Sequence, residues 1–259
     1  MSEPFHGRID VSFCNRPTSV LKFGSSVLDG PEGFRRAARE IDSEVRRGRS
    51  VVAVVSAMPG ATDTLLQLAG EVADPPPPHH VSALAATGEY ASVALLCIAL
   101  APLGIAAHRL SAGTAGLRTA GPLLDAHPTD VDTRSIVDAL TLHRVAIIPG
   151  FLGVDPSGET SLLGRGGSDL TALFLAHRLG AVECRLVKDV DGVYSADPNV
   201  PGGPAVPYAS VSWDRVLEVA GQLVQPKAVR FARTLGLPFR VAAPGGTGTW
   251  VGAVEEAVA

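Results

Sequence analysis

Three observations in the sequence predict an α/β protein built on a mainly parallel sheet. Residues 51–55 (VVAVV) form a continuous apolar, largely β-branched run, which is typical of a strand buried on both faces of a parallel sheet. Segments of strand length alternate with helical segments along most of the chain, and this alternation indicates βαβ units. A chain of 259 residues with 46% apolar residues, 28 glycines and 20 prolines also indicates buried elements joined by tight turns, and excludes a disordered protein.

The N-terminal half is expected to begin with a poorly structured lead-in over residues 1–17, followed by a short strand at 20–23. The helix expected over 32–47 has apolar residues at offsets of 3, 4, 7 and 11 from Phe34. Its arginine-rich opposite face would suit a nucleic acid or, as we prefer, a solvated surface interleaved with acids. Up to residue 150 we further expect the strand 51–55, a helix around 65–69, an extended proline spacer at 75–78, a helix at 81–100, a strand at 106–110, a long loop at 111–133, a helix at 134–142 and a strand at 145–150.

The C-terminal half is expected to begin with a hairpin around Gly158, which joins residues 151–154 to residues 160–163. We favour one compact domain over residues 18–259, with two lobes divided near residue 155. The later elements are expected to be a helix at 170–179, a strand at 184–190, a loop at 191–210, helices at 213–220 and 226–235, and strands at 239–242 and 249–251.

Charge and cysteine content narrow the class of protein. With 22 basic and 26 acidic residues the net charge is −4, so a bulk electrostatic grip on nucleic acid or on an anionic membrane is not expected. Cys14, Cys97 and Cys184 offer neither a disulfide framework nor metal-ligand spacing, which fits a reducing cytoplasm. The sequence has no uninterrupted run of 18 apolar residues and no apolar signal core near its start, so we expect neither a membrane span nor a signal peptide.

The first of three glycine-containing turns is KFGSS, residues 22–26, at the end of the first expected strand. Glycine allows backbone N–H groups to approach an anion closely, and Lys22 supplies a positive charge beside them. These residues suit a phosphate group that is held during transfer, but they are also compatible with a plain strand-to-helix turn. The spacing differs from that of a P-loop.

The second turn is GRGGSD, residues 164–169, immediately before an apolar helix. Three glycines in four positions suggest a close backbone approach to a ligand. Ser168 is expected to cap the helix, and Asp169 falls in the first turn, where a carboxylate either serves chemistry or only complements the helix dipole. Arg165 adds a planar guanidinium suited to a carboxylate or a phosphate.

The third turn begins at Lys188 and Asp189 and continues through DGVYSADP, residues 191–198. Open α/β sheets bind ligands outside the carboxyl ends of their strands, where this segment is expected to lie. The acidic residues do not have EF-hand spacing. From these residues alone, a structural turn and a nucleotide-binding edge remain equally open.

Together these segments resemble the amino acid kinase family, and the catalytic domain of aspartate kinases in particular. LGRGGSD at 163–169 is the motif most specific to aspartate kinases, and VVSAMPGATD at 54–63 is also similar to theirs. VDGVYSADP at 190–198 is shared more widely with other amino acid kinases and UMP kinases. The matching segments occur in the family's order and run over 20–27, 51–66, 87–89, 150–153, 163–172, 189–198 and 243–251.

The resemblance implies a three-layer αβα sandwich and transfer of the ATP γ-phosphoryl group to the side-chain carboxylate of aspartate, giving 4-phospho-aspartate. It implies that Lys22 stabilises the phosphoryl group in flight and that Asp169 organises Lys22 and the metal–phosphate geometry. Mg²⁺ would be held mainly by phosphate oxygens and water, with no protein metal site. Arg165 would pair with the α-carboxylate of the amino acid, Glu89 would recognise its ammonium group, and the other implied substrate contacts are Ser56, Thr62, Phe151, Gly166 and Ser168. The implied nucleotide contacts are Lys22, Gly24, Ser25, Ser26, Lys188, Asp189, Val190, Tyr194, Asp197, Pro198 and Gln222.

The chain also departs from the family pattern. One glycine is missing from the first turn, Lys188 stands at a frequent threonine, Asn199 at a common arginine and Gln222 at a frequent lysine. The segment 67–88 is shorter than in aspartate kinases, and no regulatory ACT domain follows, so we expect no feedback control through such domains. Three interpretations therefore stay open: a cytoplasmic, homodimeric aspartate kinase, a kinase of another small carboxylate, and a catalytically impaired binding subunit. The sequence contains no Gly-x-Gly-x-x-Gly motif after a strand, so a dinucleotide-dependent oxidoreductase is not indicated.

Overall fold

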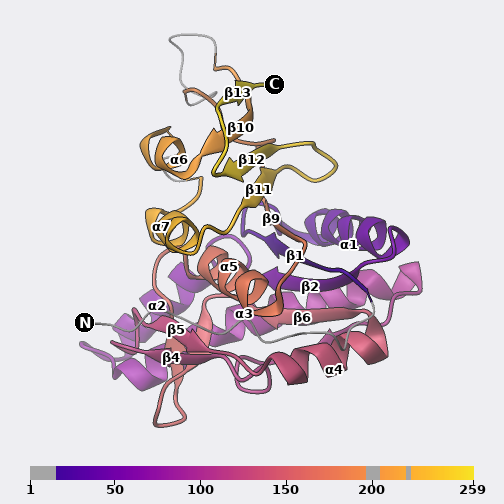
Figure 1. Cartoon of the computed structure of the whole chain (residues 1–259). Helices are drawn as coiled ribbons and strands as arrows, with labels where there is room; N and C mark the ends of the chain where they lie inside the picture. Colours follow the sequence, from indigo (N-terminus) through magenta and orange to yellow (C-terminus); the bar gives the residue numbers. More distant parts are fainter. Residues whose placement is uncertain (1–15, 197–204, 220–222) are drawn as a thin grey trace.

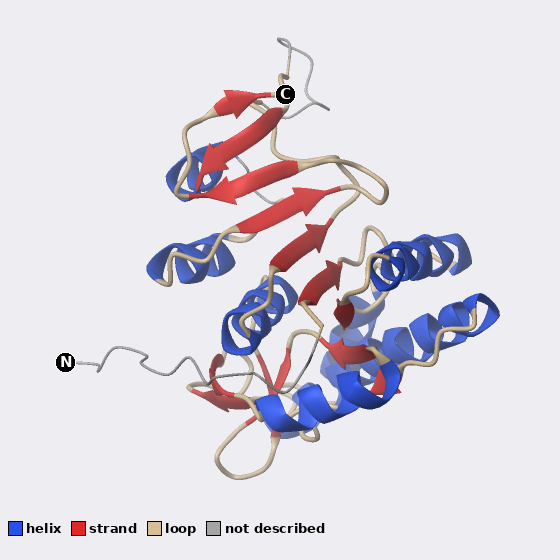
Figure 2. Ribbon diagram, turned by 45° about the vertical axis from the view of Figure 1, so that its right-hand side comes forward, coloured by secondary structure: helices blue, strands red, loops and turns tan. Residues whose placement is uncertain are grey.

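The structure is a computed structural model that describes residues 16–196, 205–219 and 223–259. Its main feature is a nine-stranded sheet with helices on both faces (Figures 1 and 2). Across that sheet the strands are β13 (Ala257–Val258), β10 (Tyr208–Ser212), β12 (Thr249–Gly252), β11 (Phe239–Ala242), β9 (Glu183–Val187), β1 (Thr18–Phe23), β2 (Ser50–Val55), β6 (Val145–Pro149) and β3 (His108–Arg109).

The helices and a small second sheet complete the fold. A four-stranded sheet contains, in order, β5 (His127–Asp130), β4 (Arg118–Ala120), β7 (Leu152–Val154) and β8 (Thr160–Leu162). The helices are α1 (Pro31–Arg46), α2 (Ala61–Val72), α3 (Pro78–Leu100), the 3₁₀ turn η1 (Ala101–Leu103), α4 (Thr133–His143), α5 (Gly167–Leu179), α6 (Trp213–Val219) and α7 (Pro226–Thr234).

The centre of the large sheet is parallel. Strands β11, β9, β1, β2, β6 and β3 pair in parallel, whereas β12 is antiparallel to β11 and β13 is antiparallel to β10. The carboxyl ends of β1, β2 and β9 therefore meet at one edge, where α/β sheets bind ligands.

Alternation along the strands produces the layers. In β2, Val51, Ala53 and Val55 belong to the core cluster under α1 and α3, while Val52 and Val54 belong to the cluster under α4, α5 and α7. All five are fully buried, because a central parallel strand is covered on both faces. The predicted three-layer αβα architecture is confirmed.

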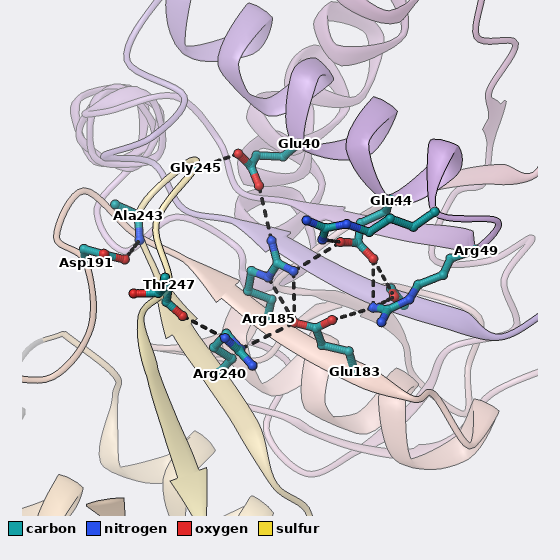
Figure 3. Close-up of polar contacts among 12 residues, drawn as sticks. Glu40, Glu44, Arg49, Glu183, Arg185, Asp191, Arg240, Ala243, Gly245 and Thr247 are labelled. Atoms are coloured by element: carbon teal, nitrogen blue, oxygen red, sulfur yellow. Dashed lines mark hydrogen bonds and ion pairs between the residues drawn. The ribbon is translucent and has the colours of Figure 1, made fainter. Parts of the chain in front are cut away.

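A charged network fastens α1 to the sheet (Figure 3). Glu44 of α1 is fully buried and pairs with Arg49 and with Arg185 of β9. Glu40, on the same helix, accepts a hydrogen bond from Gly245 N at 2.6 Å and pairs with Arg185 at 3.2 Å. The network thus links α1 to the turn after β11. The exposed arginines of α1 also pair with acids, as in the Arg46–Asp42 pair, which supports the solvated-surface interpretation of that face.

Several predicted boundaries were wrong. Residues 208–210, the end of the loop expected at 191–210, belong to β10, and short strands β4 and β5 occupy part of the expected loop at 111–133. These strands pair with partners distant in sequence, which local patterns do not reveal. Pro78 begins α3, where its missing N–H costs nothing, so it is not part of an extended spacer. Strand β9 ends at Val187 and not at residue 190.

Two further expectations concern the organisation of the chain. The division into two lobes near residue 155 falls in the β7–β8 connection and stays a prediction. Most of the expected N-terminal lead-in lies outside the described residues.

The sequence analysis expected no membrane span, but the segment that contains α3 meets the length and composition criteria for one. With the following turn, residues 78–103 are long and apolar enough to cross a bilayer by length and composition alone. However, the side chains of Ser82, Glu89 and Ser92 are buried within the protein, as are 44% of the residues in the most apolar window. In this fold the segment is a helix packed against the sheet.

Candidate active site

A cavity of about 320 Å³ opens at the carboxyl ends of β1, β2 and β9. Strand β1 contributes Lys22, α3 contributes Glu89, and the turn before α5 contributes Arg165. Segments that are far apart in sequence therefore meet at the edge predicted for ligand binding. The other predicted site residues that line the cavity are Ser25, Ser56, Thr62, Phe151, Gly166, Ser168, Asp169 and Lys188.

Two lysines share one buried carboxylate at the base of the cavity. Lys22 Nζ lies 2.8 Å from Asp169 Oδ1, and Lys188 Nζ lies 2.9 Å from Asp169 Oδ2. The three residues are 3–8% exposed. With both lysines charged the group carries one excess positive charge, which is suited to an incoming anion.

The environment shifts the acid–base properties of this group. Burial would raise the pKa of Asp169, but the charges of Lys22 and Lys188 outweigh burial and lower that pKa to about 2. Burial and the nearby Lys22 charge lower the pKa of Lys188, against the opposing effect of Asp169. Asp169 is therefore ionised at neutral pH, and its contact with Lys188 favours the charged form of that lysine.

Glu89 presents a second buried carboxyl to the cavity from α3. It is 3% exposed, and its Oε2 has no hydrogen-bond partner among the described residues. Burial raises the pKa of Glu89 to about 8, although a hydrogen bond from the Ala57 backbone and the Lys22 charge act in the opposite direction. A carboxyl in this state gains a partner when a cationic group enters the cavity.

The glycine turn before α5 follows a different pattern from the one expected. Gly166, with φ 78°, is the N-cap residue, and α5 begins at Gly167, so the prediction that Ser168 caps the helix was wrong. A side chain at Gly166 would meet Gln225 at 2.4 Å, which explains why this left-handed position requires glycine. Asp169 lies in the first turn as predicted, but its carboxylate is turned to the two lysines.

The cavity wall beside this turn contains a strained residue, Phe151, and a close contact between Gly150 and Ser168. Phe151 lines the cavity with φ 68°, which is rare for a bulky residue. Its N–H donates to Thr171 Oγ1 at 3.2 Å and its carbonyl accepts from Leu163 N at 2.8 Å, so both neighbours hold this conformation. A side chain at Gly150 would lie 2.6 Å from Ser168 Cβ, because the end of β6 touches the start of α5.

Lysine is rare in this chain, and all three lysines lie around the same segment. Lys22 and Lys188 hold Asp169, while Lys227 Nζ donates to Asp125 Oδ1 at 2.8 Å, to the Ala126 carbonyl at 3.2 Å and to the Leu163 carbonyl at 2.8 Å. These contacts use all three donors of the ammonium group. Lys227 thus fixes the residue immediately before the glycine turn that carries Arg165.

The structure distributes the predicted nucleotide residues unevenly. Gly24 lies next to Lys22, since a side chain at Gly24 would meet Lys22 Nζ at 3.2 Å. Ser26 donates to Asp189 Oδ1 at 3.0 Å, and neither of these two residues lines the cavity. Val190 and Tyr194 do not line the cavity, and Tyr194 forms a bridge with Pro207. Asp197, Pro198 and Gln222 lie outside the described residues.

Several lining residues had no assigned role in the sequence analysis. All but Gln225 lie within the quoted motifs, so the signal was present, but their placement depends on how the β2–α2 and β8–α5 connections fold. These residues are Ala57, Met58, Gly60, Asp63, Gly164, Gly167 and Gln225. Gln225 is the N-cap residue of α7 and lies outside those motifs.

The fold and the comparisons with known proteins together define the family of this chain. The chain belongs to the amino acid kinase family, because the sequence model of that family matches residues 17–242. The predicted family membership and α/β fold are confirmed.

The relatives of this chain include many aspartokinases. It is 37% identical to aspartokinase 2 of Bacillus subtilis over 225 residues, which is 86% of this chain and 55% of that protein. Identity is also 37% with the aspartokinase of Thermus thermophilus, over 226 residues and again 86% and 55%. The chain therefore spans about half the length of the curated relatives it matches.

Solved structures of aspartate kinases are also similar to this chain. The aspartate kinase from Synechocystis matches with a TM-score of 0.77 and 31% identity, over 92% of this chain and 40% of that one. UMP kinase from Bacillus anthracis, at 16% identity and a TM-score of 0.65 over 94% and 99% of the two chains, shows the shared fold alone.

Proposed function

We propose that the protein transfers the γ-phosphoryl group of ATP to the side-chain carboxylate of L-aspartate, giving 4-phospho-L-aspartate and ADP. The observation that carries this proposal is the placement of Lys22, Asp169 and Lys188 in one cavity with Glu89 and Arg165. The likeness to aspartokinases supports aspartate as the acceptor.

Phosphoryl transfer to a carboxylate requires stabilisation of negative charge more than it requires a general base. An acceptor carboxylate oxygen forms a bond to the γ-phosphorus, and the bond from that phosphorus to the oxygen of the β-phosphate breaks, so that ADP leaves. The carboxylate is already ionised at neutral pH. The obstacle is repulsion between two anions, and Lys22 and Lys188 offset it with preorganised charge. Asp169 keeps the two ammonium groups side by side without cancelling both charges.

The amino acid would be held at both of its α-substituents. Arg165 has no ion-pair or hydrogen-bond partner within the described ranges, so its guanidinium is available for the α-carboxylate. Glu89 is suited to the ammonium group, because its unpartnered oxygen is buried in the cavity wall. Ser56, Thr62, Phe151, Gly166 and Ser168 would complete the acceptor side.

The nucleotide would occupy the side formed by the first and third turns. Lys22, Lys188 and the backbone of Gly24, Ser25 and Ser26 would contact phosphate oxygens. No group of three His, Cys, Asp or Glu residues suited to a metal ion occurs in the described part of the chain, so Mg²⁺ would be held by phosphate oxygens and water. Asp189, Val190, Tyr194, Asp197, Pro198 and Gln222 remain predictions as nucleotide neighbours.

The expected location is the cytoplasm, where ATP is available and Cys97 and Cys184, both free in the structure, would stay reduced. The expectation that feedback control through ACT domains is absent remains a prediction.

The second candidate is a kinase of another small carboxylate. Two features of the cavity wall favour it. The connection between α2 and α3 is short. Helix α2, which contributes Thr62 and Asp63 to the cavity, has no buried residue. A wall built on so lightly packed a helix would suit a different acceptor.

Trapping of acyl phosphate separates these candidates. Purified protein is incubated with ATP, Mg²⁺, hydroxylamine and one acid from a panel of amino acids and small carboxylates, and hydroxamate is measured. We expect hydroxamate from L-aspartate. Hydroxamate from another acid alone would establish the second candidate, and failure to bind ATP or to hydrolyse it with any acid would indicate a binding subunit without catalysis.

Replacement of Arg165 by alanine should raise the KM for aspartate by roughly 10- to 100-fold, because a charge-assisted hydrogen-bond pair is lost. The KM for ATP should change little, and Arg165→Lys should recover only part of the loss, since an ammonium cannot bind a carboxylate through two parallel bonds. Initial rates at varied aspartate give the result. An unchanged KM for aspartate would contradict the carboxylate role.

Binding of aspartate should release about one proton per site near pH 7, because an entering ammonium favours the charged form of Glu89. The pKa of about 8 means that this carboxyl is largely protonated at pH 7 in the free protein. Calorimetric titrations in buffers of different ionisation enthalpy measure the proton count. Glu89→Gln should abolish most of the release, and equal release by both proteins would disprove the role of Glu89.

A further inference from the structure

The turn that carries Arg165 is built from residues that do not fix a conformation by themselves. Gly164 precedes Arg165 and Gly166 follows it, and both glycines are in the left-handed region, with φ 67° and 78°. Glycine reaches this region without strain, but it also leaves the backbone more freedom than any other residue does. Arg165 itself is exposed and has no partner within the described ranges. Contacts from outside the turn must therefore determine where its guanidinium points.

The connection between β4 and β5 supports the turn on its N-terminal side. A side chain at Gly164 would collide with Asp125 Oδ1, so the Asp125 carboxylate packs directly on that glycine. Ala126 N donates to the Leu162 carbonyl at 2.8 Å, and Leu162 N donates to the Leu123 carbonyl at 2.7 Å. The connection is thus hydrogen-bonded to β8, the strand that leads into the turn.

Lys227 of α7 joins both segments to a third. Its ammonium group donates to Asp125 Oδ1 and to the Ala126 carbonyl in the β4–β5 connection, and to the Leu163 carbonyl immediately before the turn. These contacts use all three of its donors, and Lys227 does not line the catalytic cavity. The ammonium group therefore connects parts of the protein and is not free to bind a substrate anion.

Gln225 supports the turn on its C-terminal side. It is the N-cap residue of α7, two positions before Lys227, and a side chain at Gly166 would collide with Gln225 Cβ. Gln225 also lines the cavity beside Arg165. The start of α7 therefore contacts the chain both before and after Arg165.

Helix α7 is held in place without these contacts. Val229 is fully buried, and the ring of Phe231 lies 6.1 Å from that of Phe174 on α5. The side chains of Lys227 and Asp125 are 36% and 70% exposed, and an ion pair as exposed as this contributes little to the free energy of unfolding. The contacts of Lys227 therefore matter more for the position of the turn than for the stability of the fold.

We propose that Lys227, together with Asp125 and Gln225, is a positioning residue for the acceptor: it holds the glycine turn so that the Arg165 guanidinium faces the cavity before the acceptor arrives. This inference rests on the proposed function, in which Arg165 binds the α-carboxylate of the amino acid. A guanidinium that is already in place binds without the cost of ordering its loop. Lys227 thus acts on the affinity for the acceptor through Arg165, without touching the acceptor.

Initial rates of hydroxamate formation test the proposal on the full chain with Lys227→Met, which keeps the length of the side chain and removes its donors. The KM for aspartate should rise by roughly 10-fold, because the turn must then be ordered when the acceptor binds, whereas kcat and the KM for ATP should stay within about 2-fold. Lys227→Arg keeps the charge and should recover part of the loss. Arg233→Met, which breaks an exposed ion pair with Asp214 on the same helix, is the matched control and should leave the KM for aspartate unchanged. Thermal unfolding shows that each variant folds.

A double-mutant cycle separates positioning from a general structural effect. In a chain that already carries Arg165→Ala there is no guanidinium to position, so Lys227→Met should change the KM for aspartate by less than about 2-fold. A rise by the same factor with and without Arg165 would overturn the proposal. So would a Lys227→Met variant that has the KM of the wild type.

Hydrogen exchange gives a readout that does not depend on activity. Gly167 N donates to the Gly164 carbonyl at 2.9 Å, so the exchange rate of this amide reports how firmly the turn is closed. We expect exchange in residues 163–169 to be several-fold faster in Lys227→Met than in the wild type or in Arg233→Met. If the wild type forms no hydroxamate from aspartate, the proposed function fails, and exchange alone decides the positioning role. Unchanged exchange in Lys227→Met would overturn that role whatever the acceptor is.

Discussion

Replacing Lys22 by methionine should lower kcat for phosphoryl transfer by about 100- to 1000-fold, comparable with the loss of one preorganised charge-stabilising group. Methionine keeps the length and apolar stem of lysine but removes the charge. Asp169 keeps Lys188 as its partner at 2.9 Å, so the variant should fold. The measurements are hydroxamate formation with saturating aspartate and ATP, and thermal unfolding.

The split between kinetic constants distinguishes this role from simple nucleotide binding. A charge that acts mainly on the transferring group lowers kcat more than it raises the KM for ATP. Lys22→Arg should recover little, because a planar guanidinium does not fit a site built for a point charge only 5% exposed. Arg46→Met, on an exposed pair of α1, is the control and should retain activity. A Lys22→Met variant with kcat within a few-fold of wild type would refute the proposed role.

The sequence predicted which residues form the site better than it predicted which of them contact each other. Lys22 and Asp169 were singled out because they occur in turns whose residue types suit anion binding, whereas Glu89 was implied only by the resemblance to aspartate kinases. The resemblance implied that Asp169 organises Lys22, but the contact of Lys188 with the other oxygen of Asp169 was not predicted, since the three residues come from β1, the end of β9 and α5. These three residues come into contact because of the order of the strands in the sheet. That order depends on pairing between strands that are distant in sequence, which local sequence patterns do not reveal.

Local rules failed where tertiary contacts decide the outcome. Ser168 has a preferred capping side chain, yet Gly166 takes the cap position because the turn must pass close to Gln225 in a left-handed conformation. Strand β10 was missed because its pairing partners, β12 and β13, come from the end of the chain. By contrast, β2 was predicted closely, since a continuous apolar run is sufficient to define a strand covered on both faces.

Replacing Asp169 by asparagine should affect both turnover and stability. Asparagine keeps the shape but leaves Lys22 and Lys188 buried without their shared anion, and breaking a buried ion pair costs about 3 kcal/mol or more of unfolding free energy. We expect kcat to fall by about 1000-fold or more, because both cations lose their fixed positions. Asp130→Asn, which breaks the surface pair with Arg178, is the control and should cost less than about 1 kcal/mol.

The dependence of stability on pH gives a readout that a loss of packing would not produce. The pKa of Asp169 is about 2 in the folded protein and 3.8 as its ordinary value. A lowered folded pKa means that the stabilisation is complete above pH 3.8 and is lost as the pH falls toward 2. It amounts to about 2 kcal/mol. The difference in unfolding free energy between wild type and Asp169→Asn, from urea titrations, should therefore be largest above pH 5 and shrink below pH 4. A difference that is constant over this range would show that the ionised carboxylate does not hold the two lysines.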